Sequence, residues 1–147
     1  MAAESVTPYL VLRDAARAIA WYLRVFGASE DFRLAYPDGK IGHAELRFGS
    51  GRLYLADEHP DFGALGPVSI GGTPVSLHVY VPDADATLAL GEAEGGTVLR
   101  AAKDEFYGDR SGMLLDPFGH KWHVSSRKET VSAEEMQKRF NALLAGT

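Results

Sequence analysis

The sequence predicts an α+β fold made of two β-α-β-β-β modules and one further C-terminal helix. Short segments alternate apolar and polar residues with a period of two, which is typical of strands with one buried and one open face. Residues 75–81 show this most clearly, because the valines and Leu77 face one side while Ser76, His78 and Tyr80 face the other. The order of strand and helix patterns then repeats in the second half, which indicates an internal duplication.

The composition is that of an ordinary globular domain. The chain has 147 residues, 46% hydrophobic and 24% charged, so we expect a single domain over residues 1–147. It has no cysteine, which excludes disulfides, thiolate metal ligands and a cysteine nucleophile. A net charge of −5 without a clustered basic stretch argues against nucleic acid as a partner. No apolar run is long enough to cross a membrane and no signal-peptide pattern is present, so we expect a cytoplasmic protein without a membrane partner.

The first module is expected at about residues 5–57. Asp14 is a good candidate for the N-cap of its helix, and Gly27 for the stop at the C-terminal end. Residues 37–40, with the sequence Pro-Asp-Gly-Lys, have typical hairpin-turn chemistry. The expected elements are a strand at residues 6–12, a helix at 15–26, and strands at 32–36, 43–48 and 52–57.

A loop rich in glycine and proline, residues 58–72, follows as a linker between modules or a flap over a site. The C-terminal helix, at about residues 131–145, begins with a capping box formed by Ser132 and Glu135. The second module is expected at about residues 73–126, with a strand at 75–81, a helix capped by Asp83 or Asp85, and strands at 97–103, 111–116 and 120–125.

The two modules can be aligned by their helix caps and turn glycines. Asp14 and Asp83 each lie seven residues after a small hydroxyl residue. Gly51 lies four residues before Leu55, and Gly119 lies four residues before His123, so the alignment pairs these two strand residues. The alignment makes four positions on the first and last strands equivalent: Thr7, Leu55, Ser76 and His123.

The polar strand faces are expected to line a cavity, if the apolar faces pack on the helices. Trp122 and Tyr54 are expected on the helix-facing side, in the core. Tyr107 lies in a loop that combines an aromatic residue, a glycine and two charged residues, which is typical of the mouth of a pocket. The expected ligand-binding residues are Thr7, Tyr9, His43, Glu45, Arg47, Leu55, Ser76, His78, Tyr80, Tyr107 and His123.

Several stretches resemble the vicinal-oxygen-chelate superfamily, which holds glyoxalase I, bleomycin-resistance proteins and extradiol dioxygenases, and in particular its PhnB-like branch. The Asp-Pro-Phe-Gly turn followed by an aromatic residue is the most specific of them. The resemblance implies that the two modules form a curved, incompletely closed mixed sheet around a cavity, commonly completed across a homodimer. The stretches are residues 7–10, 41–47, 107–110, 116–122 and 131–136.

Metal-dependent members of this superfamily carry four ligands on the first and last strands of their two modules. The resemblance places these ligands at Thr7, Leu55, Ser76 and His123. Only His123 is a competent ligand, because neutral hydroxyl groups bind divalent ions poorly and a leucine has no donor atom. We therefore predict no metal site of the glyoxalase type and no cofactor.

Two classes of function are compatible with these residues. The first is a homodimeric protein that binds or sequesters a small, partly aromatic ligand without changing it, as resistance proteins of the superfamily do. The alternative is an enzyme, either a metal-dependent lyase, isomerase or dioxygenase with a relocated site at His43, Glu45, His78 and His123, or one that uses His78 and His123 alone. That pair could serve as general acid and base, because imidazoles titrate near neutral pH. We favour the binding protein, since three metal ligands are missing and 10% of the residues are aromatic.

Overall fold

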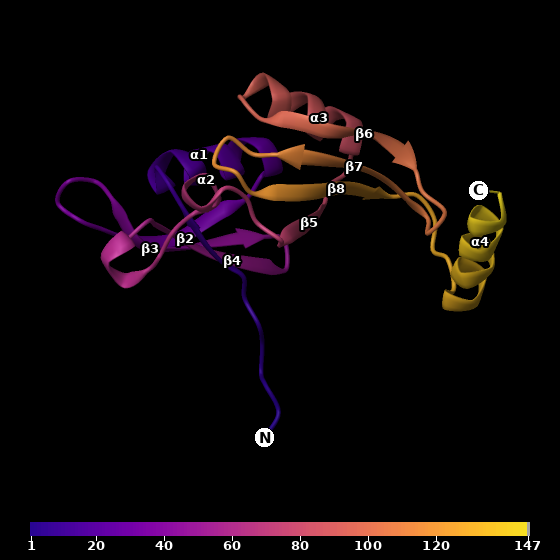
Figure 1. Cartoon of the computed structure of the whole chain (residues 1–147), viewed down its shortest axis with the longest axis horizontal. Helices are drawn as coiled ribbons and strands as arrows, with labels where there is room; N and C mark the ends of the chain where they lie inside the picture. The colour runs from indigo at the N-terminus through magenta and orange to yellow at the C-terminus, as the bar shows by residue number, and fades with distance from the viewer. Residues whose placement is uncertain (147) are drawn as a thin grey trace.

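The computed structural model describes residues 1–146 and confirms the predicted fold class. This part of the chain forms two four-stranded mixed sheets and four α-helices, and neither sheet closes on itself (Figure 1). Helices α1 and α3 lie on the same side of the two sheets in this view. None of the helices in the described part has the length and apolar character of a membrane span.

The first module forms a sheet with the strand order β1-β4-β3-β2. Strand β1 runs parallel to β4, and the other neighbours are antiparallel. Its elements are β1 (Tyr9–Leu12), α1 (Ala15–Phe26), β2 (Ser29–Ala35), β3 (Ile41–Phe48) and β4 (Gly51–Asp57).

The second module repeats this topology with the strand order β5-β8-β7-β6. Strand β5 is parallel to β8, and the remaining pairs are antiparallel. Its elements are β5 (Ser76–Tyr80), α3 (Ala84–Ala93), β6 (Thr97–Asp104), β7 (Asp109–Leu115) and β8 (Lys121–Arg127).

The strand register corrects the alignment of the modules. Tyr9 pairs with Tyr54 across β1 and β4, and His78 pairs with His123 across β5 and β8, so equivalent residues differ by 69 in number. The prediction that Leu55 corresponds to His123 is therefore wrong by one residue. Because a shift of one residue moves every side chain of a strand to the other face, Leu55 lies fully buried in the core and Tyr54 lies on the open face.

The starts of α1 and α3 are each held by a side chain from the last strand of the same module. The prediction that the Asp14 side chain caps α1 is wrong, because Asp14 has a φ of 59° and its side chain makes no capping hydrogen bond. Instead, Asp57 Oδ1 accepts a hydrogen bond from the backbone N–H of Ala15 at 2.9 Å. At the equivalent place in the second module, Ser126 Oγ accepts from the N–H of Ala84 at 2.7 Å. The duplication thus extends to the capping of its helices.

The other predicted caps are present. Asp83 Oδ1 accepts a hydrogen bond from the N–H of Ala86 in the first turn of α3. Ser132 Oγ accepts from the N–H of Glu135 and so begins α4 (Ala133–Ala145). Both contacts satisfy an N–H group that would otherwise lack a partner inside the helix.

The segment expected as one irregular loop contains two short helices, η1 (Pro60–Phe62) and α2 (Pro67–Ile70). Each begins with a proline, whose fixed φ suits the first turn of a helix. Gly66, between the two helices, lies so close to β1 that a Cβ atom there would be 2.8 Å from the Cα of Leu12. The loop therefore packs over β1 rather than hanging free.

One hydrophobic core joins the two modules. The indole of Trp122 in β8 packs against Phe26 and Phe48 of the first module, with ring centroids 4.6 and 5.7 Å apart. The indole N–H of Trp21 in α1 donates a hydrogen bond to the carbonyl of Glu94, just after α3. Trp122 is thus a core residue, as predicted.

His120 belongs to the same junction. The side chain of His120 lies in a turn but is buried, and its Nε2 lies 3.1 Å from the carbonyl oxygen of Val11. The turn that holds it folds back onto β1, a long-range contact that the local turn chemistry does not show.

Helix α4 stands away from both sheets (Figure 1). Its apolar side chains Phe140, Leu143 and Leu144 are exposed, and none of its described side chains is buried. Arg139 connects it to the body by hydrogen bonds to Glu129 and to the carbonyl of Phe106, at 2.6 and 3.0 Å. The rings of Phe106 and Phe140 add a contact at 5.6 Å.

Candidate functional site

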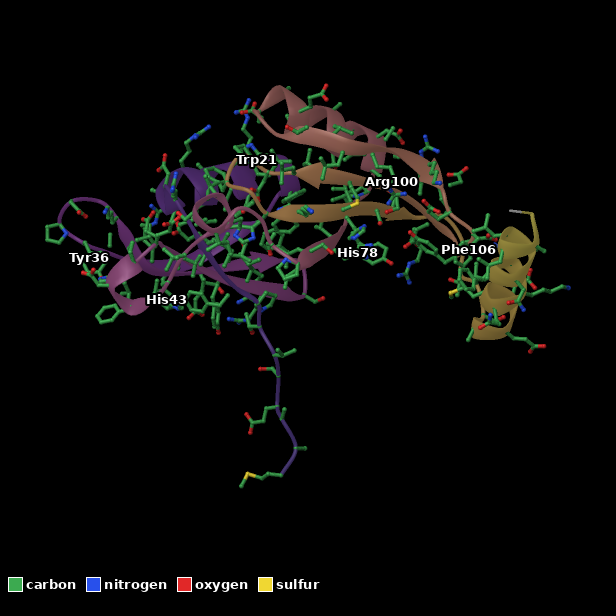
Figure 2. All side chains as sticks on the ribbon, in the orientation of Figure 1. Trp21, Tyr36, His43, His78, Arg100 and Phe106 are labelled. Carbon is green, nitrogen blue, oxygen red and sulfur yellow. The ribbon has the colours of Figure 1, made fainter. Side chains whose placement is uncertain are left out.

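The faces of the sheets opposite α1 and α3 carry the polar residues that the sequence indicated. His43 on the first sheet and His78 on the second both project from this side (Figure 2). The side chains form two separate clusters, one on each sheet. The first cluster adjoins a cavity of about 600 Å³ through Tyr9.

The first cluster is a chain of hydrogen bonds from β1 to β3. The hydroxyl of Tyr9 lies 2.7 Å from His43 Nδ1, and His43 Nε2 lies 2.9 Å from Glu45 Oε2. The second carboxylate oxygen of Glu45 is 3.8 Å from a guanidinium nitrogen of Arg52. An ionised carboxylate can only accept hydrogen bonds, so the contact with Glu45 assigns a proton to Nε2 of His43. In the neutral imidazole with this proton, Nδ1 accepts the hydrogen bond of the Tyr9 O–H.

Aromatic rings surround His43. The ring centroids of Tyr9, Tyr54 and Phe32 lie 5.4, 5.2 and 5.9 Å from that of His43. Tyr54 belongs to this group although the sequence placed it in the core. Three rings and two hydrogen bonds together fix the plane of the imidazole.

Tyr9 remains a proton donor at neutral pH. Partial burial and the negative charge of Glu45 raise the pKa of the Tyr9 hydroxyl above its usual value. About half of the Tyr9 side chain is nevertheless exposed, with a relative accessibility of 49%. One end of the hydrogen-bonded chain therefore faces the solvent side of the sheet.

A cavity of about 600 Å³ opens beside Tyr9. Its walls come from the open face of β1 and β4, from the hairpin turn after β2 and from the loop that contains η1. Four of the wall residues are aromatic or imidazole rings, and the rings of His59 and Phe62 are in contact at 4.3 Å. Drug-sized ligands occupy cavities of this size in proteins. The ring-bearing residues are Tyr9, Tyr36, His59 and Phe62.

The second cluster lies on β5, β7 and β8. His78 Nε2 is 2.8 Å from the hydroxyl of Ser125, which in turn is 2.8 Å from the hydroxyl of Ser111. The rings of His78 and His123 are 5.7 Å apart, so the predicted pair does meet. Desolvation, followed by the charge of His123, lowers the pKa of His78. His78 is therefore neutral at neutral pH.

Tyr80 and Tyr107 line a smaller cavity of about 250 Å³ near α4. The hydroxyl of Tyr80 donates a hydrogen bond to the buried carboxylate of Asp109 at 2.7 Å, and this bond raises the pKa of Tyr80. The guanidinium of Arg127 lies over the Tyr80 ring at 4.8 Å. These contacts fix the side chain of Tyr80, which remains half exposed and is still a predicted ligand-binding residue.

Among the remaining predicted residues, Ser76 lies beside the second cluster and Thr7, Arg47 and Leu55 join neither cluster. Ser76, the exposed first residue of β5, lines a cavity of about 470 Å³ together with His78 and Tyr80. Thr7 lies two residues before β1. Arg47 forms an ion pair with Asp31 at 3.2 Å. Leu55, in the core, cannot contact a ligand on the open face.

The relocated metal site is not assembled. His43 and Glu45 lie on the first sheet and His78 and His123 on the second, and residues 1–146 bring no three histidine or acidic side chains together in the geometry of a metal site. The superfamily's metal positions hold equally poor donors. With the corrected register they are a threonine and a serine hydroxyl, the phenol of Tyr54 and the imidazole of His123, which do not fit a divalent ion.

Sequence reasoning missed one ring beside His43, that of Tyr54, and three wall residues of the cavity, Tyr36, His59 and Phe62. Tyr54 was lost through the one-residue error in register. The other three lie in a turn and a loop, where alternation assigns no face. The one available signal was the presence of large aromatic residues in segments otherwise rich in glycine and proline.

This fold, with its paired modules and open polar faces, defines a glyoxalase-like protein. Residues 5–124 match the family model of the Glyoxalase/Bleomycin resistance protein/Dioxygenase superfamily, and the chain belongs to that superfamily. An uncharacterized protein of Mycobacterium bovis is 40% identical over 141 residues, which cover 94% of this chain and 93% of the relative.

Two solved structures show the same architecture. Protein PA1353 of Pseudomonas aeruginosa is 26% identical with a TM-score of 0.70, and the match covers 86% of this chain and all of that one. TioX of Micromonospora sp. ML1 is 27% identical with a TM-score of 0.62, covering 85% and 99%. These proteins are similar to the chain in sequence and fold.

Proposed function

We propose that this protein binds a small, partly aromatic molecule in the 600 Å³ cavity beside Tyr9. The observation that carries this proposal is the aromatic lining of that cavity. Tyr36 and Phe62 are 52% and 82% exposed, although large apolar surfaces are normally buried. Rings that stay exposed around a hollow are available to stack on a planar ligand.

Thermal stability in the presence of ligands tests the proposal, because a ligand that binds only the folded state raises the melting temperature. We expect at least one member of a panel of aromatic natural products to raise it. Tyr36→Ala and Phe62→Ala should each reduce the shift. Leu99→Ala is the matched control, because Leu99 is similarly exposed but lies on β6, outside the cavity. A panel without any shift, or a shift that survives both cavity variants, would contradict the proposal.

We propose that binding needs no metal ion. The donor set at the superfamily's metal positions supports this, because hydroxyl and phenol groups are weak ligands for divalent ions. Elemental analysis of protein purified without a histidine tag should find no stoichiometric transition metal. About one metal ion per chain, lost in His43→Ala or His78→Ala, would instead favour the metal-dependent lyase, isomerase or dioxygenase.

We further propose that the protein is a homodimer of the PhnB-like branch. Residues 41–47 and 107–110 support the branch assignment. Exposed apolar side chains on the edge strand β2, Phe32 and Leu34, support dimerisation, since a second chain would cover them. A partner placed over the open face would also close the cavity.

A further inference from the structure

The hydrogen-bonded chain on the first sheet has the design of a proton relay. In a relay of the serine-hydrolase type, a carboxylate fixes the tautomer of a histidine, and the free nitrogen of that histidine accepts the proton of a hydroxyl. Here Glu45 takes the place of the carboxylate, His43 that of the base, and Tyr9 that of the hydroxyl, at 2.9 and 2.7 Å. Tyr9, which supplies the hydroxyl, is half exposed and is one of the residues that line the cavity.

We propose that Tyr9, His43 and Glu45 form an acid–base relay that isomerises a bound carbonyl compound between its keto and enol forms. This inference rests on the proposed ligand site, since the substrate must occupy the cavity beside Tyr9. Tyr9 is the catalytic residue that faces the substrate. His43 stores the proton, and Glu45 is a positioning residue that also stabilises the imidazolium.

The step balances without any co-reactant. The carbon next to the carbonyl gives its proton to the Tyr9 oxygen, while the proton of Tyr9 passes to Nδ1 of His43. The electron pair of the broken C–H bond becomes the C=C bond of an enolate, and the carbonyl oxygen takes the negative charge. The proton then returns from His43 through Tyr9 to that oxygen and gives the enol.

Two features of the site favour this order of proton transfers over one in which Tyr9 is already ionised as a free phenolate. The pKa of Tyr9 is raised by partial burial and by Glu45, so the phenol accepts a substrate proton only as its own proton leaves. The rings of Tyr54 and Phe32 hold the imidazole in place, so the proton path is set before the substrate binds. The second sheet lacks this arrangement, because His78 Nε2 contacts the hydroxyl of Ser125, which bonds in turn to the hydroxyl of Ser111, and neither of these residues is a carboxylate.

The chemistry also defines the substrate class. The substrate has a carbonyl group next to a carbon that carries hydrogen, and an aromatic ring that stacks on Tyr36 or Phe62. Phenylpyruvate is a simple probe with both parts. Its methylene protons exchange with solvent deuterium when it enolises, and NMR follows that exchange.

The first experiment needs no ligand. Nitrogen-15 NMR of the histidine side chains should show His43 as a single neutral tautomer with its proton on Nε2. Tyr9→Phe should shift the Nδ1 resonance, and Glu45→Gln should produce a mixture of tautomers. A mixture in the native protein, or no response to either substitution, would overturn the relay.

The second experiment measures deuterium uptake by phenylpyruvate. We expect at least a tenfold acceleration over buffer and a loss of about 100-fold or more in the rate at saturation for Tyr9→Phe, a size typical of acid–base catalysis. Tyr36→Ala should raise KM and leave that saturated rate nearly unchanged. A thermal shift with phenylpyruvate but no exchange, or exchange that persists in Tyr9→Phe, would overturn the catalytic role and leave the binding protein standing. A panel without any thermal shift would refute the ligand site, while the tautomer experiment still decides the relay.

Discussion

Asp116 is the most heavily hydrogen-bonded side chain at the junction of the two modules. Its Oδ2 accepts from the hydroxyl of Tyr22 at 2.6 Å and from the indole N–H of Trp122 at 2.9 Å. Its Oδ1 accepts from the backbone N–H groups of Phe118 and His120. A buried carboxylate is tolerated only when its acceptor sites are filled in this way.

Removing one of these donors should destabilise the fold. Tyr22→Phe keeps the buried ring but deletes the hydrogen bond to Asp116, and a bond to a charged group contributes about 1.5–3 kcal/mol. We expect the free energy of unfolding in urea to fall by roughly that amount. Tyr36→Phe, at an exposed tyrosine, is the control and should have little effect. Equal stability of the two variants would show that the remaining three donors satisfy the carboxylate.

The imidazole of His78 should lose its proton at a lower pH than an ordinary histidine does. Its pKa is lowered by desolvation and then by His123, so the NMR titration midpoint should lie below the ordinary value of 6.5. His123→Gln should move the midpoint upward, because the neighbouring positive charge is gone. A midpoint that stays in place would show that His123 does not influence His78.

The lowered pKa of His78 also makes the stability of the fold depend on pH. Between its folded pKa and 6.5, His78 binds a proton less readily in the folded than in the unfolded chain. Its contribution therefore favours unfolding as the pH drops below 6.5, and it vanishes above that value. His78→Gln should lessen the acid-induced fall in melting temperature, since glutamine keeps the donor to Ser125 but does not titrate.

Helix α4 differs from α1 and α3 because it is attached by the bonds of Arg139 and the ring contact of Phe140 with Phe106 rather than by a buried face. Arg139 bonds to Glu129, to the carbonyl of Phe106 and, within the helix, to Glu135. Segments with few buried contacts open locally at little cost in free energy. The contact through Arg139 therefore sets how tightly this helix is attached.

Arg139→Ala should release α4 without disturbing the sheets. Hydrogen–deuterium exchange is expected to rise in residues 128–145 and to stay the same in the strands, because the variant removes only the local tether. Lys138→Ala, the adjacent basic residue, is the control. Unchanged exchange of α4 in the Arg139 variant would indicate that another surface, such as a partner chain, holds the helix.

At the scale of the whole molecule, the proposed dimer can be tested directly. Light scattering at micromolar concentration should give twice the mass of the chain. Replacing Phe32 and Leu34 together by lysine should shift the protein towards the monomer, because charged side chains on an edge strand oppose its pairing with a second chain. A monomeric mass for the native protein would contradict the proposal.

The duplication made most of the fold predictable from sequence. Period-two and helical patterns are local, so they identified both modules and their caps at Asp83 and Ser132. The register of β4 could not be predicted in the same way, because it depends on the length of the preceding loop, which differs between the modules. Two residues join β3 to β4, whereas five join β7 to β8. A single turn glycine could therefore not align Leu55 and Tyr54 correctly.

The candidate site was only partly predictable for a related reason. Alternation placed Tyr9, His43 and Glu45 on one face, but β4 separates β1 from β3, and no sequence pattern gives the distance across it. The walls built by Tyr36 and Phe62 depend on how a turn and a loop fold back over the sheet. Such paths are set by tertiary packing, as the close approach of Gly66 to β1 illustrates.

The junction at Asp116 also bears on the ancestry of the chain. The place that Tyr22 has in α1 is taken in α3 by Gly91, where any Cβ would lie 2.5 Å from a methyl group of Leu114. A chain assembled from two copies of the second half would have Asp116 but no tyrosine at the place of Tyr22. A chain assembled from two copies of the first half would have Tyr22 but not the carboxylate of Asp116. The halves have become complementary, so neither can be restored to a self-pairing ancestor by simple exchange.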